Sequence, residues 1–304
     1  MISTPSPSCP LTESPSSEAD CAKRLNLHEC LDRWRVEAQH GVLDTGRYRC
    51  RYVVWGRGPT LVLVPGMAMD ALAFVMPMAR LQAQFRCVSF DLPSGDGDGA
   101  RMMTYRHADH VNDLFALLDH LSISRCVVVG SSFGSTIALA ALQAQPQRFS
   151  KAILLSGFAR RPLARAEVIA ASFARFLPGR LGHLPFARHI LEHNQREALL
   201  ARDSNMLKFF IDKHLTIPVQ ALASRALLIH RVDLRPILPA IRHPILMICG
   251  DRDPLVGKAC EAELKQGLPL AARAEIENCG HLAPLTHPEV LAEVIQQYLS
   301  ATCG

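Results

Sequence analysis

A serine between two glycines lies where an apolar stretch of the sequence gives way to a helical one. Ser132 is the centre of Gly130-Ser131-Ser132-Phe133-Gly134, which follows the run CVVV and precedes the run STIALAALQAQ. A serine hydroxyl is a useful nucleophile only when a base activates it, and a sharp turn from strand to helix presents it clear of a sheet. The two glycines lack the Cβ atoms that would clash in such a turn. The pattern predicts that Ser132 is a nucleophile and that Ser131 points elsewhere.

Two later segments could supply a base and an acid for this serine. The apolar run PILMICG is followed by Asp251-Arg252-Asp253-Pro254, and the next strand candidate is followed by Asn278-Cys279-Gly280-His281. Loops at the carboxyl ends of parallel strands meet at one edge of a sheet, where α/β proteins build their sites. His281 is therefore the candidate general base, and Asp251 or Asp253 could orient its imidazole. His287 is nearby, but it lies where a helix begins, and we interpret it as structural.

Backbone N–H groups near Ser132 could stabilise an oxyanion. A helix that begins directly after the serine aims N–H groups and the positive end of its dipole at this position. We expect the first donor to be the N–H of Phe133, the residue after the serine, and the second to come from the loop after the strand at 60–65.

The rest of the chain predicts the elements that must position these groups. Short apolar runs alternate with helical patterns, which is typical of βα units around a mostly parallel sheet. Asp70 and Thr104 are expected helix caps, and Pro288 suits a first helical turn. The expected strands are 34–42, 47–56, 60–65, 85–91, 125–130, 151–156, 244–250 and 273–277, and the expected helices are 70–84, 105–121, 133–145, 256–267 and 287–299.

This alternation stops between Ser156 and Pro244, where helix-like patterns are broken by prolines and glycines. We predict an α/β core of residues 25–157 and 244–304, a helical cap inserted at 158–243, and a disordered Ser/Pro-rich tail at 1–24. The cap segment holds twelve Arg and two Lys against six Asp or Glu, a net charge of +8, whereas the whole chain carries +5. Two explanations are open: arginine stems that cover apolar helix faces, or a lid that attracts anionic substrates.

Taken together, five segments give the chain a family resemblance. VPGMAMD, FDLPSGDGDG, VVVGSSFGS, LMICGDRDPLV and ENCGHLAPLTHPEVL occur in this order. Over residues 35–300 the chain resembles the α/β-hydrolase fold superfamily, in its cap-bearing, esterase-like branch. The resemblance implies an eight-stranded, mostly parallel sheet flanked by helices, and a catalytic triad of Ser132, His281 and Asp253. The family pattern G-x-x-D is what favours Asp253 over Asp251.

The chain departs from the family pattern at two loops. Pro65-Gly66 stands where the family usually has His-Gly, which leaves the Met67 N–H available but removes a side-chain hydrogen bond in that loop. Ser94 is an additional residue in the loop DLPSGDGDG, whose Asp91 we interpret as structural. The serine itself argues against haloalkane dehalogenase and epoxide hydrolase chemistry, for which the family uses an aspartate at the same turn.

The expected function is hydrolysis of a small-molecule carboxylic ester or related acyl bond. Amide hydrolysis, C–C bond hydrolysis, acyl transfer and a non-catalytic receptor remain alternatives. Phe173, Phe176, Leu177, Phe209 and Phe210 could line an acyl pocket, but we expect them to form the core of the cap. No cofactor, metal, nucleic acid or membrane span is predicted, the expected location is cytoplasmic, and the oligomeric state is left open.

Overall fold

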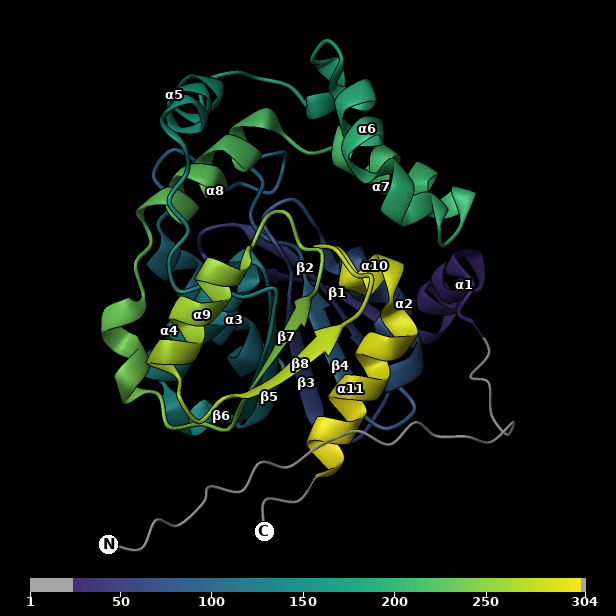
Figure 1. Cartoon of the computed structure of the whole chain (residues 1–304), viewed down its shortest axis with the longest axis vertical. Helices are drawn as coiled ribbons and strands as arrows, with labels where there is room; N and C mark the ends of the chain where they lie inside the picture. The colour runs from purple at the N-terminus through teal and green to yellow at the C-terminus, as the bar shows by residue number, and fades with distance from the viewer. Residues whose placement is uncertain (1–23, 302–304) are drawn as a thin grey trace, which may run out of the picture.

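The computed structural model describes residues 24–301, which are built around one eight-stranded sheet (Figure 1). The strand order is β1-β2-β4-β3-β5-β6-β7-β8. β2 pairs antiparallel with β1 and with β4, and the other neighbours pair in parallel. The predicted sheet is thus confirmed. The strands are β1 (Gln39–Asp44), β2 (Arg49–Trp55), β3 (Thr60–Val64), β4 (Arg86–Phe90), β5 (Cys126–Ser131), β6 (Phe149–Leu155), β7 (Ile245–Gly250) and β8 (Ala272–Ile276).

Helices cover both faces of this sheet, so its central strands are apolar on both sides. In β3, Val62 and Val64 face one buried cluster and Leu61 and Leu63 face the other, because successive side chains of a strand point to opposite faces. In Figure 1, α3, α4 and α9 lie on one side and α1, α2 and α11 on the other. The helices of the core are α1 (Leu27–Glu37), α2 (Val75–Leu81), α3 (His107–His120), α4 (Phe133–Ala144), α9 (Lys258–Gly267), α10 (Ala283–Thr286) and α11 (Pro288–Ser300).

The strand predicted at 34–42 is wrong in its first half. Residues 34–37 end helix α1, and the strand begins at Gln39. Leu27, Cys30 and Trp34 are buried at helical spacing, and the Asn26 side chain caps the helix. Val36, which a strand would have buried together with Trp34, is 85% exposed.

Two of the three predicted helix-start residues are confirmed. The Asp70 side chain accepts a hydrogen bond from the Leu72 N–H at the start of the 3₁₀ turn Ala71–Phe74, and Pro288 occupies the first turn of α11. Thr104 is not the cap of α3. That helix begins after Arg106, whose N–H donates to the Asp109 carboxylate at 2.7 Å. A carboxylate three residues into the helix satisfies this N–H from inside the first turn.

Four helices lie between β6 and β7, in the segment 158–243 that we call the insertion. They are α5 (Arg165–Ala174), α6 (Ala187–Leu200), α7 (Ser204–Leu215) and α8 (Val219–Arg231). Figure 1 shows them above the sheet end to which the arrows of β7 and β8 point, with α5 beside α8 and α6 beside α7. The predicted disordered tail, 1–24, lies outside the described residues except for Arg24. Within residues 24–301 no helix is both long and apolar enough to cross a bilayer.

A nearly buried ion pair attaches the insertion to the core. The Arg202 guanidinium lies 2.7 and 2.9 Å from the two carboxylate oxygens of Glu289 in α11, and it also donates to the Leu25 carbonyl oxygen at 3.0 Å. The two side chains are 7% and 15% exposed. Burial alone would raise the pKa of Glu289, but the hydrogen bonds from Arg202 and from the Leu25 N–H outweigh it, and the pKa lies below its ordinary value.

We expect Glu289→Gln to lower the free energy of unfolding by about 3 kcal/mol at pH 7, because the change leaves a buried guanidinium without its countercharge. The folded-state pKa of Glu289 is lowered, so its stabilisation is complete above the ordinary value of 4.5 and is lost as the pH falls through the folded value. Urea unfolding of wild type and variant between pH 3 and pH 7 measures this. The difference should narrow below about pH 4.5, and a difference that stays constant would contradict it. Glu293→Gln, which breaks the more exposed pair with Arg80, is the control and should change little.

Candidate active site

Ser132 joins β5 to α4 in a strained backbone conformation. Its φ is 52° and its ψ is −116°, a region that costs a residue other than glycine about 1–3 kcal/mol. The surrounding hydrogen bonds hold it there: its N–H donates to the Leu155 carbonyl oxygen at 2.9 Å, and its own carbonyl oxygen accepts from the N–H and hydroxyl of Ser135. The sharp turn that the sequence predicts is therefore present, and the Ser132 side chain remains partly exposed.

The two glycines of this turn are required because backbones approach each other there. A Cβ on Gly130 would lie 2.5 Å from the Gly134 carbonyl oxygen, and a Cβ on Gly134 would lie 2.3 Å from the carbonyl oxygen of Val64 in β3. The loop after β3 is also close, since a Cβ on Gly66 would lie 3.5 Å from the Ser132 Cβ. Close packing thus brings the residue before Met67 against the candidate nucleophile.

Asp253 and His281 form a hydrogen-bonded pair in the loops after β7 and β8. Asp253 Oδ2 lies 2.7 Å from His281 Nδ1, and the two side chains are 4% and 13% exposed. Asp253 Oδ1 accepts from the N–H groups of Leu255 and Val256. Burial raises the pKa of Asp253, but the hydrogen bond and charge of His281 and the two N–H groups lower it by more. The pKa therefore lies below its ordinary value, and the carboxyl stays ionised. An ionised carboxylate in this position fixes the imidazole tautomer.

The other carboxylate of this segment has a different contact. Asp251 Oδ1 accepts from the Cys279 N–H at 2.9 Å, and the Arg252 N–H donates to the Cys279 carbonyl oxygen at 3.0 Å. Asp251 thus ties the loop after β7 to the loop after β8 and does not contact the imidazole. His287 precedes α11, and its Nδ1 lies 2.9 Å from the Thr286 hydroxyl.

Ser132 and the Asp253–His281 pair share one edge of the sheet. The backbone connects them, because the Ser132 N–H is bonded to the end of β6 and the Ser156 N–H is bonded to Ile248 of β7. Within the described part of the chain, no hydrogen bond joins the Ser132 hydroxyl to His281. Catalytic hydrogen bonds are often long in a free enzyme and shorten in the substrate complex.

The two residues expected to supply oxyanion donors lie in segments next to Ser132. Phe133 is the first residue of α4, where N–H groups have no partner within the helix. Its buried ring packs against the rings of His107 and His110 in α3, with centroids 5.9 and 5.3 Å away. Met67 follows Gly66 in the loop after β3, and its carbonyl oxygen accepts a hydrogen bond from Arg225 of α8.

Sequence reasoning missed Arg225. The side chain is almost completely buried, and its two terminal nitrogens donate to the carbonyl oxygens of Met67, Leu92 and Pro93. Nothing in the sequence of α8 distinguishes it from the exposed Arg231 six residues later. The position of α8 over the core determines which carbonyl oxygens the Arg225 side chain contacts.

The expectation that five apolar residues form the core of the insertion is wrong for three of them. Phe173 is 72% exposed, Phe176 is 67% exposed and Leu177 is 48% exposed. Phe210 is buried, and Phe209 packs partly buried against the same cluster. Helix α5 packs mainly against α8, and Ala171 is its one buried residue, so Phe173 stays exposed.

A cavity of about 580 Å³ lies beside the loop after β3. Ala68, Met69 and Asp70 form one wall, and Phe209 and Arg225 of the insertion line it from the other side. Ser132, Asp253 and His281 do not line it. The cavity therefore adjoins the residues after Met67 and not the serine.

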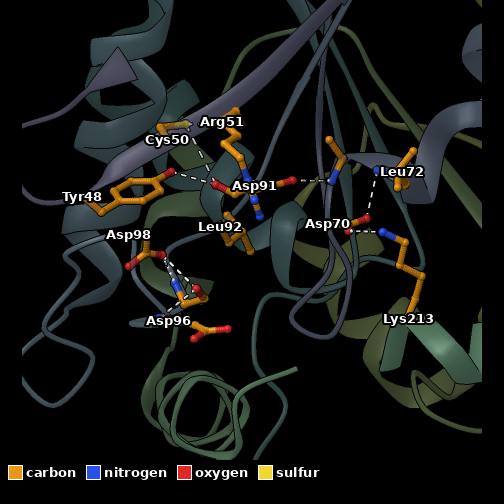
Figure 2. Close-up of polar contacts among 12 residues, drawn as sticks. Tyr48, Cys50, Arg51, Asp70, Leu72, Asp91, Leu92, Asp96, Asp98 and Lys213 are labelled. Carbon is orange, nitrogen blue, oxygen red and sulfur yellow. Dashed lines mark hydrogen bonds and ion pairs between the residues drawn. The ribbon is translucent and has the colours of Figure 1, made fainter. Parts of the chain in front are cut away.

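Carboxylates organise the loops around this cavity (Figure 2). Asp91 accepts from the Ala71 N–H at 3.0 Å and from Arg51 at 2.9 Å, in agreement with a structural role. The Asp98 side chain accepts from the backbone and hydroxyl of Ser94, the additional residue of its loop. Burial and the nearby charge of Asp70 raise the pKa of Asp91 above its ordinary value.

Comparison with known proteins assigns the family. Residues 59–288 match the profile described as alpha/beta hydrolase fold. The chain belongs to the alpha/beta hydrolase fold family. An uncharacterized hydrolase of Bacillus subtilis is 27% identical over 79% of this chain and 89% of its own length. A pimeloyl-[acyl-carrier protein] methyl ester esterase of Aeromonas hydrophila is 24% identical over 81% of this chain and 97% of its own length.

Solved structures of other alpha/beta hydrolases share the fold. A hydrolase from Pseudomonas aeruginosa aligns with a TM-score of 0.76 at 18% identity, over 86% of this chain and 99% of its own. An enol-lactonase from Burkholderia xenovorans aligns with a TM-score of 0.74 at 21% identity, over 86% of this chain and 100% of its own. At these identities the likeness establishes the fold and leaves the substrate to other arguments.

We expect Gly134→Ala to destabilise the fold by about 1–3 kcal/mol, because the new Cβ would overlap the Val64 carbonyl oxygen and the backbone must shift to make room. Thermal and urea unfolding measure the loss. Gly280→Ala is the matched control, since the nearest atom to its Cβ would be 3.8 Å away. Equal stability of the two variants would show that the close approach at Gly134 is not a constraint.

Proposed function

We propose that this alpha/beta hydrolase is a serine hydrolase that cleaves a carboxylic ester, or a related acyl bond, of a small molecule. Ser132 is the nucleophile, His281 the general base and Asp253 the group that orients it. The observation that carries the proposal is the 2.7 Å contact between Asp253 and His281, at the same sheet edge as a serine in a strained turn. The relatives named as an esterase and an enol-lactonase support acyl chemistry.

The proposed reaction has two halves. His281 Nε2 takes the proton of the Ser132 hydroxyl as Oγ attacks the substrate carbonyl carbon, and the carbonyl oxygen becomes an oxyanion that accepts hydrogen bonds from the N–H groups of Met67 and Phe133. The imidazolium then gives its proton to the leaving alcohol, and the acyl group stays on Ser132. In the second half His281 deprotonates a water molecule, which attacks the acyl carbon. The imidazolium then returns the proton to Ser132 Oγ as the bond between Oγ and the acyl carbon breaks and the acid leaves. This sequence uses no cofactor or metal.

The insertion is proposed to act as the cap over this site, with the division into a core of 25–157 and 244–304 and a cap of 158–243. Its exposed residues Phe173, Phe176 and Leu177 are proposed to contact the acyl part of the substrate, because large exposed apolar groups are typical of binding surfaces. The excess of arginine in the insertion has a structural use, as hydrogen-bond donors to carbonyl oxygens of the core. Arg161, Arg175, Arg202 and Arg225 donate to carbonyl oxygens of Leu255, Met103, Leu25 and Met67, respectively.

Other reactions of the same triad remain alternatives. Amide hydrolysis, C–C bond hydrolysis and acyl transfer to an acceptor other than water share the serine-bound adduct and differ in how the substrate is held. A receptor without turnover would have no physical need for the hydrogen-bonded Asp253–His281 pair, and this argues against it.

We expect a fluorophosphonate probe to label the wild-type protein, and to label neither Ser132→Ala nor His281→Ala, because labelling needs an activated serine. Ser131→Ala is the matched control for the neighbouring hydroxyl and should label like wild type. Gel fluorescence and the mass of the labelled peptide give the result. Hydrolysis of p-nitrophenyl esters of increasing chain length then measures the size of the acyl pocket. Labelling that persists in folded Ser132→Ala would refute the assignment.

We expect Asp253→Asn to lower kcat by about 10³–10⁴-fold with little change in KM, because the amide cannot hold the required imidazole tautomer. Steady-state kinetics with the best p-nitrophenyl ester measure this. Asp251→Asn is the comparison: it weakens the bond to the Cys279 N–H without touching the imidazole, and should cost far less. A larger loss of kcat in Asp251→Asn than in Asp253→Asn would show that the acid is Asp251 and not Asp253.

A further inference from the structure

A buried guanidinium links the insertion to the loop that carries Met67. Arg225 lies in α8 and is 4% exposed. Nη1 donates to the Met67 carbonyl oxygen, and Nη2 donates to the carbonyl oxygens of Leu92, at 3.1 Å, and Pro93, at 2.6 Å. One side chain of the insertion therefore contacts two loops of the core, after β3 and after β4.

The partners of this cation are backbone carbonyls and not carboxylates. Burial lowers the pKa of Arg225 to about 10, and the negative charges of Asp98 and Asp91 act in the opposite direction. A buried charge is costly unless hydrogen bonds satisfy it. Three carbonyl oxygens accept from Nη1 and Nη2, and Nε has no hydrogen-bond partner among the described residues. A guanidinium at this position therefore needs a reason beyond packing, and the two loops that it joins supply one.

The contact with Met67 acts on the residue that carries the proposed oxyanion donor. The Met67 carbonyl and the Met67 N–H belong to the two peptide planes on either side of one Cα atom. Fixing the carbonyl restricts the rotation of this residue, and thereby the direction of its N–H. Gly66 packs against Ser132 on the other side of the same residue. Two contacts thus restrict the direction of the Met67 N–H: the packing of Gly66 against Ser132, and the hydrogen bond from Arg225 to the Met67 carbonyl oxygen.

A second helix of the insertion holds the other end of the same loop. Lys213 of α7 lies 3.3 Å from Asp70 Oδ2, and the Ala71 N–H donates to Asp91 Oδ1 at 3.0 Å (Figure 2). The Lys213–Asp70 pair is more than a third exposed on both sides and contributes little by itself. Arg225, which is buried and makes three hydrogen bonds, is the main connection.

We propose that Arg225 is a positioning residue for the oxyanion hole, through which the docking of the insertion on the core sets the Met67 N–H. The proposal rests on the proposed function, since it concerns the same hydrolytic site. Docking of α8 and formation of the hole then occur together. An insertion displaced from the core leaves Met67 without its hydrogen bond, and Ser132 without one of its two oxyanion donors.

The test compares Arg225→Met and Arg225→Lys with wild type, with Ser132→Ala as the inactive reference. Arg231→Met, at the exposed end of the same helix, is the matched control. Thermal unfolding first fixes a temperature at which every variant is folded. Three quantities are then measured. They are kcat and KM for the best p-nitrophenyl ester, and the inhibition constant of phenylboronic acid, which forms a tetrahedral adduct with an active serine.

In Arg225→Met we expect kcat to fall about 10- to 100-fold, with KM changed less than about threefold, because a misdirected donor weakens the transition state and not the bound substrate. The inhibition constant of the boronate should rise in parallel with the loss of kcat/KM. Arg225→Lys should lie in between, since it keeps the charge but its single ammonium cannot reproduce the planar fork that reaches both loops. Arg231→Met should match wild type.

Three results would overturn the proposal. Folded Arg225→Met with kcat within about twofold of wild type would show that the hole forms without the guanidinium. A loss confined to KM would assign Arg225 to substrate binding. If Arg225→Met does not fold, wild-type kcat in Arg225→Lys is the refuting result. Failure of the proposed function is distinct, because wild type would then show no activity that depends on Ser132, and both proposals would fall.

Discussion

The close approach of backbones around Ser132 is the constraint on which the rest of the site depends. Gly134 of α4 lies against the Val64 carbonyl at the end of β3, and Gly130 of β5 lies against the first turn of α4. Neither position has room for a Cβ, so strand, helix and neighbouring strand pack at backbone distance. Ser132, at the centre of this packing, has a positive φ, and Gly66 of the loop after β3 lies close to it. One steric arrangement therefore leaves the serine partly exposed and brings together the segments that hold both N–H candidates.

A second arrangement, of hydrogen bonds, positions the candidate base, His281. Hydrogen bonds from Asp251 and Arg252 to Cys279 join the loop after β7 to the loop after β8. The same two loops carry the hydrogen-bonded Asp253 and His281. The two carboxylates of this segment thus have different contacts. Asp251 joins the two loops, and Asp253 contacts the imidazole of His281. Backbone hydrogen bonds from the turn at Ser132 to β6, and from the residue after β6 to β7, carry this register across the sheet.

Several arginines of the insertion bind the core. A net charge of +8 over 158–243 could indicate an anionic partner, yet several of its arginines donate to carbonyl oxygens of the core. An arginine can satisfy carbonyls of more than one loop with a planar fork, which a lysine cannot. Positive charge in the insertion is thus in part a means of attachment. Phe173 in α5 and Phe176 just after this helix are exposed, so the attachment leaves apolar surface of the insertion open.

The sequence by itself determined the eight strands, their mostly parallel class, and the segments that hold Ser132, Asp253 and His281. These follow from local patterns: apolar runs for strands buried on both faces, glycines where backbones touch, and turn residues at strand ends. Local pattern was insufficient at residues 34–37, where a helical face ending at Trp34 competed with a strand, and at Thr104, where the carboxylate of Asp109 satisfied the helix start two residues later.

Only the tertiary structure decided which residues of the insertion are buried. Arg225 and Arg231 are equivalent in the sequence of α8, but one is buried against three carbonyl oxygens and the other is exposed. Likewise, the sequence predicts that Phe173 and Phe210 are both buried in the core of the insertion, but only Phe210 is buried. The reason is physical: periodicity fixes which face of a helix is apolar, whereas burial depends on which distant segment packs against that face. For a helix that packs across loops of the core, this partner is set by the whole fold.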